Sequence, residues 1–204
     1  MMRSGIAGIL GGVFLAQGVW AQGVFAQDVS AELAGDPAAG KVLAGQCRTC
    51  HGLNGFARIP IAPHIGGENP MYLIHQLTAF RDGSREHEMM TVVAKGLTDA
   101  AIADLAAWYA SQTITATLPA GASADMAPET CVGCHGADGI ALIEDAPNLA
   151  GENLIYTETQ LKAFRTGKRV HDIMTPIASE LTDEDMRSVA AWYEAVTLEI
   201  APAP

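Results

Sequence analysis

The sequence predicts an all-α protein made of two tandem domains that arose by duplication of one unit. Three observations support this: a gap-free internal repeat, helix-start and helix-stop signals at matching places in both copies, and no convincing alternating pattern of the kind typical of a β-strand. Residues 47–109 match residues 131–193, 84 positions later, with 31 identities in 63 positions. A self-match of this strength indicates a duplicated domain.

The first 26 residues are expected to be a signal peptide. Arg3 supplies a short positive region, an apolar stretch rich in Gly and Ala follows, and small residues permit cleavage after Ala26 or, less favourably, after Ala21. An uncleaved membrane anchor is the alternative, but the stretch is short and glycine-rich for a spanning helix. No later apolar run is long enough to cross a bilayer. We therefore expect export to the periplasm and no spanning segment after signal removal, with peripheral membrane association left open.

Composition divides the rest of the chain into two domains. Residues 27–112 are predicted as the first domain and residues 113–204 as the second, with the Ala-, Thr-, Gly- and Pro-rich stretch 113–127 as the linker. A short helix is expected over residues 37–46, directly before the first copy of the repeat. Its counterpart near residues 126–130 is curtailed, so the two copies differ at their starts.

Two further helices are predicted in each copy. In the first copy, one begins at Asn69-Pro70, because Asn is a favoured N-cap and Pro suits the first helical position, and it stops at Gly83. The other begins at Thr98-Asp99 and carries apolar residues at the helical spacing i, i+3, i+4, i+7. The second copy repeats these signals at Asn153, at Gly167, and at Thr182 with Asp185, which resembles a capping box.

Each copy contains a Cys-x-x-Cys-His pentapeptide, and these two motifs hold every cysteine of the chain. This is the form of a c-type haem attachment site, in which two thiols bond the haem vinyl groups and the adjacent His ligates iron. Zinc would need four well-placed ligands per site, and a thioredoxin-like disulfide would need a βαβ context. The sequence therefore predicts two covalently bound haem c groups, each forming the core of its small domain. The predicted anchors are Cys47, Cys50, Cys131 and Cys134, and the predicted iron ligands are His51 and His135.

The repeat also indicates a second iron ligand in each copy. Met174 is the single methionine between the second pentapeptide and the last helix, and it lies 39 residues after His135. Met90 lies 39 residues after His51. Ligation by His and Met is typical of electron-transfer haem, so Met90 and Met174 are the predicted axial partners. Met89 is interpreted as an apolar neighbour, since its repeat partner is an isoleucine.

Other polar residues are weaker candidates for the haem sites. His87 and His171, three residues before the two methionines, are the alternative axial ligands. Arg85 and Arg169 are expected to contact haem propionates, because a guanidinium group suits a carboxylate. His64 has no histidine partner in the other copy, where Asn148 stands, so it is not assigned to the shared site. Still weaker propionate candidates are Tyr72, Gln76, Arg81 and their repeat partners.

The chain is acidic, with a formal net charge of −11. Loss of the signal peptide would remove one arginine and no acidic residue. This charge disfavours nucleic acid as a partner. It suits a redox protein with a basic docking surface, although acidity also keeps an exported protein soluble.

With these motifs, the chain resembles the two-domain dihaem cytochromes c of the cytochrome c4 type. The resemblance rests on the paired Cys-x-x-Cys-His-Gly motifs, the Gly-Glu-Asn and Phe-Arg-x-Gly runs, and the Met segments that lead into Leu-Thr-Asp and Ala-Ala-Trp-Tyr. It implies two class I cytochrome c domains related by a pseudo-twofold axis, each wrapped around a haem c. It also implies that Pro63 and Pro147 offer their carbonyl groups to the ligand imidazoles. One departure is Thr91-Val92, where the second copy has Thr175-Pro176.

Three functions follow from this resemblance. The leading hypothesis is a periplasmic electron carrier between a respiratory or dehydrogenase donor and a terminal oxidase or other acceptor, with no substrate of its own. The second is a dihaem subunit of a dehydrogenase, such as a flavocytochrome c sulfide dehydrogenase or a related sulfur-oxidising system. The third is a haem enzyme such as a dihaem peroxidase, which would need an iron with an open position; a Met in both copies argues against it.

Overall fold

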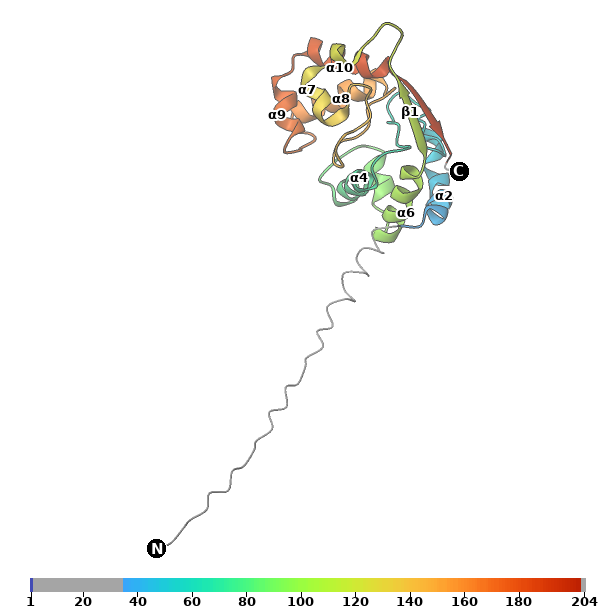
Figure 1. The fold of residues 1–204 in the computed structure, drawn as a ribbon. Coiled ribbons are helices and arrows are strands. Elements are labelled where there is room, and N and C mark those ends of the chain that lie inside the picture. Colours follow the sequence, from blue (N-terminus) through green and yellow to red (C-terminus); the bar gives the residue numbers. More distant parts are fainter. Residues whose placement is uncertain (2–34, 203–204) are drawn as a thin grey trace.

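The protein was analysed as a computed structural model that describes residue 1 and residues 35–202. The predicted signal peptide therefore lies outside the described residues, apart from Met1. Figure 1 shows the first copy of the repeat, with α2, α4 and α6, below the second copy, with α7 to α10. Helices dominate both copies, which confirms the predicted all-α class.

The first copy consists of a short helical entry and three later helices. Their bounds are α2 Pro37–Leu43, η1 Ala44–Gln46, α3 Arg48–His51, α4 Pro70–Asp82, α5 Met90–Ala94 and α6 Asp99–Ala110. The expected helix over residues 37–46 is present as α2 followed by the 3₁₀ turn η1.

The second copy repeats this order except at its start. Its helices are η2 Ala124–Met126, α7 Glu129–His135, α8 Leu154–Arg165, α9 Met174–Glu180 and α10 Asp183–Glu194. Nothing equivalent to α2 precedes α7 in the described residues; only the single turn η2 stands there. The predicted curtailment of this segment is confirmed.

The residues predicted to begin or end helices do so in the structure. The Asn69 side chain accepts from Met71 N–H at 2.8 Å to begin α4, and Gly83 ends that helix in the left-handed conformation, with φ of 82°. Thr182 and Asp185 form a full capping box at the start of α10. The helices α5 and α9 were not predicted; each begins at one of the proposed iron-ligating methionines.

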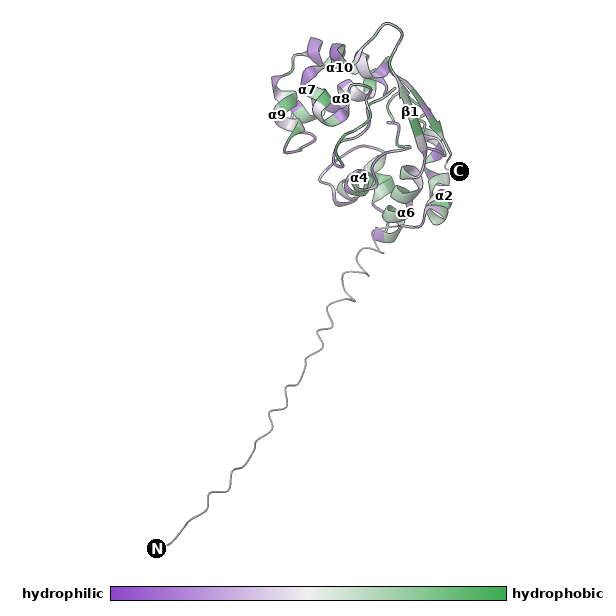
Figure 2. Cartoon of the chain, in the orientation of Figure 1, coloured by the Kyte–Doolittle hydropathy of each residue, from purple (hydrophilic) through white to green (hydrophobic). Residues whose placement is uncertain are grey.

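Packing differs between the two copies. In the first copy, Leu73, Leu105 and Tyr109 are buried together in a cluster to which Leu43 at the end of α2 also contributes. In the second copy, the corresponding cluster is formed by residues of α8, α9 and α10, and no covering helix contributes to it from the described residues. Figure 2 shows α6 mainly in the hydrophobic colour, whereas α9 and α10 carry hydrophilic segments.

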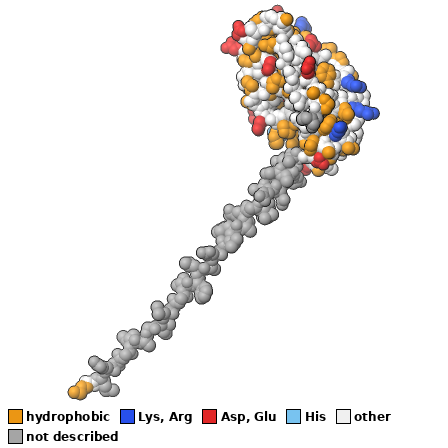
Figure 3. Space-filling view, turned by 45° about the vertical axis from the view of Figure 1, so that its right-hand side comes forward, with side chains coloured by type: hydrophobic (Ala, Val, Ile, Leu, Met, Phe, Trp, Pro, Cys, Tyr) orange, Lys and Arg blue, Asp and Glu red, His pale blue; other side chains and the backbone are white. Residues whose placement is uncertain are grey.

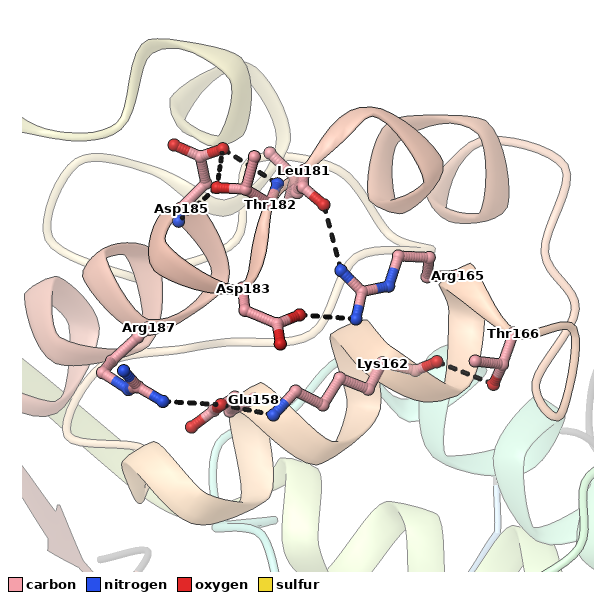
Figure 4. A network of polar contacts seen from close by, with 9 residues as sticks. All are labelled: Glu158, Lys162, Arg165, Thr166, Leu181, Thr182, Asp183, Asp185 and Arg187. Atoms are coloured by element: carbon pink, nitrogen blue, oxygen red, sulfur yellow. Dashed lines mark hydrogen bonds and ion pairs between the residues drawn. The ribbon is translucent and has the colours of Figure 1, made fainter.

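A polar network joins α8 to α10 (Figure 4). Arg165 donates to the Asp183 carboxylate at 2.6 Å, and Glu158 accepts from Lys162 at 2.5 Å and lies 3.6 Å from Arg187. One partner of each pair is well exposed to solvent, so solvent screening limits what the pair contributes to stability on its own. Figure 3 shows several acidic side chains over the upper part of one face, while Lys and Arg side chains gather at its right-hand edge.

A two-stranded antiparallel sheet, which the sequence analysis did not predict, joins the segments that directly follow the two copies. Strand β1, Thr113–Thr117, lies within the predicted linker, and β2, Thr197–Ala201, follows α10. Thr115 pairs with Glu199, its own repeat partner, so the two strands exchange places about a pseudo-twofold axis. The chain can pair these strands only because the two copies face each other.

No helix among residues 35–202 is both long enough and apolar enough to cross a membrane.

Candidate functional site

The histidine of each pentapeptide is buried and held in one orientation. His51 ends α3, and its Nδ1 donates to Pro63 O at 2.9 Å. His135 ends α7, and its Nδ1 donates to Pro147 O at the same distance. A carbonyl oxygen can only accept, so Nδ1 carries the proton and Nε2 is the nitrogen available to a metal. Burial lowers the pKa of both histidines, which keeps the rings neutral as a metal ligand must be.

The four cysteines lie in the two pentapeptides, each partly buried, and none forms a disulfide. Burial raises the pKa of Cys47 and of Cys131, so neither thiol is activated as a nucleophile toward other substrates. In the residues that the structure describes, no group of three or more His, Cys, Asp or Glu side chains could hold a metal ion. These observations disfavour the zinc and redox-disulfide interpretations and fit thioether attachment of haem.

Both proposed methionine ligands are partly buried at the start of a short helix. The Met90 N–H donates to His87 Nδ1 at 3.4 Å, and the Met174 N–H donates to His171 Nδ1 at 3.2 Å. The two alternative ligands are thus already engaged as acceptors at the helix starts. Met89 is 60 % exposed, which suits a neighbour more than a ligand.

Arg85 connects the two copies. Its guanidinium donates to Gln76 Oε1 at 2.6 Å within its own copy and, across the contact, to Gln160 Oε1 at 2.8 Å and Tyr156 OH at 3.2 Å. The guanidinium also stacks over the Phe80 ring at 4.4 Å.

Arg169 makes the reciprocal set of contacts. It donates to Gln160 Oε1 at 2.9 Å and, across the contact, to Gln76 Oε1 at 2.9 Å and Tyr72 OH at 3.3 Å. Each glutamine therefore accepts from both arginines. This exchange follows the same pseudo-twofold relation as the strand pairing.

The two guanidinium groups place two positive charges at this contact, and no carboxylate of the described residues pairs with them. Arg85 is only 9 % exposed, and no described carboxylate lies within ion-pair distance of either guanidinium. A buried cation without a counter-ion is costly, so the pair fits an anionic group such as haem propionates. Arg81 instead pairs with Asp99 at 2.7 Å and lies outside this network.

A second reciprocal contact involves two buried glutamates that the sequence analysis did not single out. The Glu68 carboxylate accepts from Asn148 N–H at 3.1 and 3.0 Å, and the Glu152 carboxylate accepts from His64 N–H at 2.9 Å. Burial raises the pKa of each glutamate to about 8. The signal available in the sequence was the repeated Gly-Glu-Asn run, which the repeat comparison noted without a role.

Comparison with known proteins places these features in a family. Residues 120–192 match the family described as cytochrome C oxidase, cbb3-type, subunit III. The chain is 34% identical over 173 residues to cytochrome c4 of Thiocapsa roseopersicina, which covers 75% of this chain and 88% of that protein. It is 32% identical over 175 residues to a thiosulfate dehydrogenase electron acceptor of Thiomonas intermedia, which covers 76% of this chain and 80% of that protein.

The fold agrees with this similarity. The structure of reduced recombinant cytochrome c4 from Pseudomonas stutzeri superposes with a TM-score of 0.70 at 28% identity, covering 80% of this chain and 100% of that one. The resemblance drawn from the paired motifs and the predicted pair of class I cytochrome c domains are both confirmed.

Proposed function

Because this chain belongs to the cytochrome c4 family, we propose that it is a periplasmic carrier that takes electrons from a respiratory or dehydrogenase donor and passes them to a terminal oxidase or another acceptor. The chain is an electron-transfer protein with two covalently bound haem c groups. The observation that supports the carrier function best is the reciprocal arginine contact, because it holds two matched sites in one fixed arrangement. Electrons can then enter at one site and leave at the other.

The proposal gives each site residue a task. Haem iron supplies the one-electron redox chemistry. Pro63 and Pro147 orient the imidazoles and raise their basicity as ligands. Arg85 and Arg169 neutralise the propionate charge at the contact between the copies. The covalent anchors are Cys47, Cys50, Cys131 and Cys134, and the axial ligands are His51, Met90, His135 and Met174.

The experiment that tests the carrier function is the native mass and flavin content of the haem-staining species, in gentle periplasmic and membrane extracts. A flavin-free species near the monomer or dimer mass is the expected result. A larger species that co-elutes with flavin or with another catalytic subunit would contradict a free carrier.

A second candidate is the electron-accepting subunit of a sulfur-compound dehydrogenase. The similarity to a protein named as a thiosulfate dehydrogenase electron acceptor favours it. Purified holoprotein should then be reduced by thiosulfate in the presence of a thiosulfate dehydrogenase, and not by thiosulfate alone. Reduction at the same slow rate with and without the enzyme would exclude this donor.

A further inference from the structure

Within the part of the chain that the structure describes, a helix covers one face of α6 in the first copy, and no helix covers the corresponding face of α10 in the second. In the first copy, α2 crosses α6 at Gly40, where a Cβ atom would collide with the Asp104 carbonyl group and lie 2.8 Å from Trp108 Cβ. Asp36 N–H donates to Asp104 Oδ1 at 2.6 Å, and the Lys41 ammonium lies 5.1 Å from the centre of the Trp108 ring. The α2 helix therefore covers this face through a small residue at the crossing and a cation over the tryptophan.

Among residues 35–202, no helix covers the same face of α10. The residues that correspond to α2 in the repeat are 121–127, and they form only the turn η2. A groove of about 350 Å³ remains between α7, α9 and α10. Trp192 is only partly buried there, whereas its counterpart Trp108 is 9 % exposed. The groove is lined mainly by Met126, Pro128, Ile177, Leu181, Val189 and Trp192.

The negative charge along the groove favours a positively charged ligand. Glu129 and Asp185 line it, and Ser188 stands where the first copy has Asp104. A helix placed here as α2 lies on α6 would carry its cation over Trp192, in a groove that two carboxylates also line. Cys131 also lines the groove, so a helix bound there would lie beside the attachment point of the second haem.

We propose that this groove is the docking site for a basic helix of the redox partner, with a Gly or Ala at the crossing point and a Lys or Arg over Trp192. The proposal rests on the proposed function, because it takes the partner to be a protein that exchanges electrons with this chain. Binding of an amphipathic helix in an apolar groove is a recurring mode of recognition, and here the protein's own first copy supplies the template.

The test uses a hydrocarbon-stapled peptide with the sequence of residues 37–46, in which Lys41 is the one charged side chain, since an unconstrained helix this short would not persist in water. Binding to the holoprotein is followed through the Trp192 indole N–H signal in NMR spectra. We expect saturable binding that weakens as ionic strength rises. Ser188→Trp fills the groove from an exposed helix position and should weaken binding at least about tenfold.

Arg187→Trp is the matched control, because Arg187 is the exposed neighbour of Ser188 and does not line the groove. Removing its positive charge should, if anything, favour a basic peptide. A peptide in which the position of Lys41 is Glu should bind more weakly. No change in the Trp192 signal, or equal weakening by both protein variants, would overturn the proposal.

A functional readout separates this proposal from the carrier function. The peptide should slow reduction of the holoprotein by a protein donor such as a thiosulfate dehydrogenase, while reduction by ascorbate stays unchanged. If the peptide binds but does not compete with the donor, the groove is not the partner site, and the carrier function stands. Self-association abolished by Ser188→Trp would show that a second copy occupies the groove and would also overturn the proposal.

Discussion

His64 and Asn148 occupy the same position in the two copies and make the same contact with the opposite copy. His64 Nε2 donates to Gly151 O at 3.1 Å, and Asn148 Nδ2 donates to Gly67 O at 3.0 Å. On the other side of each side chain, His64 Nδ1 accepts from a backbone N–H at 2.9 Å, as does Asn148 Oδ1. A neutral imidazole with its proton on Nε2 thus places a donor and an acceptor where a carboxamide does.

His64→Asn should therefore preserve the contact between the copies and remove a pH dependence. Burial lowers the pKa of His64, so the folded protein holds the ring neutral while the unfolded chain takes up a proton. Stability from this group is then present above the unfolded pKa of about 6.5 and is lost as pH falls through it. We expect the variant to match the parent at pH 7.5 and to exceed it by about 1 kcal/mol at pH 5.5 in urea unfolding. Asn148→His should enlarge the acid sensitivity; an unchanged pH profile in both variants would contradict this account.

Glu68→Gln and Glu152→Gln should raise stability at high pH, whereas His64→Asn should raise it at low pH. Burial raises the pKa of both carboxyls to about 8, well above the unfolded value of about 4.3. Their contribution is thus fully present below the unfolded pKa and is lost as pH rises through about 8. Glutamine keeps an acceptor for the backbone N–H groups, so each variant should gain at least about 1 kcal/mol over the parent at pH 8.5 in urea unfolding. Glu144→Gln, at an exposed carboxylate outside the ion pairs of the described residues, serves as control and should leave the slope unchanged.

Gly40→Ala should destabilise the first copy, whereas Gly45→Ala should not. A methyl group on Gly40 collides with the backbone of α6, and overpacking of this kind costs about 1–3 kcal/mol. No atom lies within 4 Å of a methyl group on Gly45, where alanine restricts the unfolded chain and is neutral or slightly stabilising. Thermal unfolding followed by circular dichroism compares the two. Equal melting temperatures would show that α2 does not pack on α6 as described.

Met90→Ala and Met174→Ala should each leave covalent haem in place and open one iron. Loss of a thioether ligand should allow carbon monoxide to bind one of the two reduced haems, with a fall in that haem's potential. Met89→Ala is the control, because this exposed side chain belongs to the same turn. If carbon monoxide binds the parent as readily as the variants, the assignment of the methionines is wrong.

Arg85→Gln should lower the reduction potential of a haem. A positive charge near the propionates disfavours the more positive oxidised iron, so its removal favours oxidation. Arg81→Gln changes the charge equally but acts at an arginine already paired with Asp99, and it should shift the potential less. Redox titration of the two variants measures the difference, and equal shifts would remove Arg85 from the propionate site.

Features carried by short stretches of sequence were predictable. Asn69 and Gly83 bound α4 because capping depends on a few adjacent residues. The resemblance to class I cytochromes c implied that Pro63, 12 residues after His51, offers its carbonyl to the ring, and the two atoms lie 2.9 Å apart. The caps of α4 follow from adjacent residues alone, and the same signals recur in the second copy.

Features that depend on the meeting of the two copies were not predictable. The residues of β1, Thr113–Thr117, form a strand only because the repeat partner of this segment lies beside it. His64 was set apart from the shared site because its partner is Asn148, yet the two side chains present equivalent atoms. A repeat comparison based on residue identity misses equivalence of hydrogen-bonding groups.

The strand pairing also imposes an order on biogenesis. The β1 segment precedes β2 in the chain by the whole of the second copy, from η2 to α10. The first copy can fold around its haem while β1 is still unpaired, since closing so long a loop comes after local folding. Completion of the second copy then supplies β2, so the sheet can form only after both domains of the chain are available.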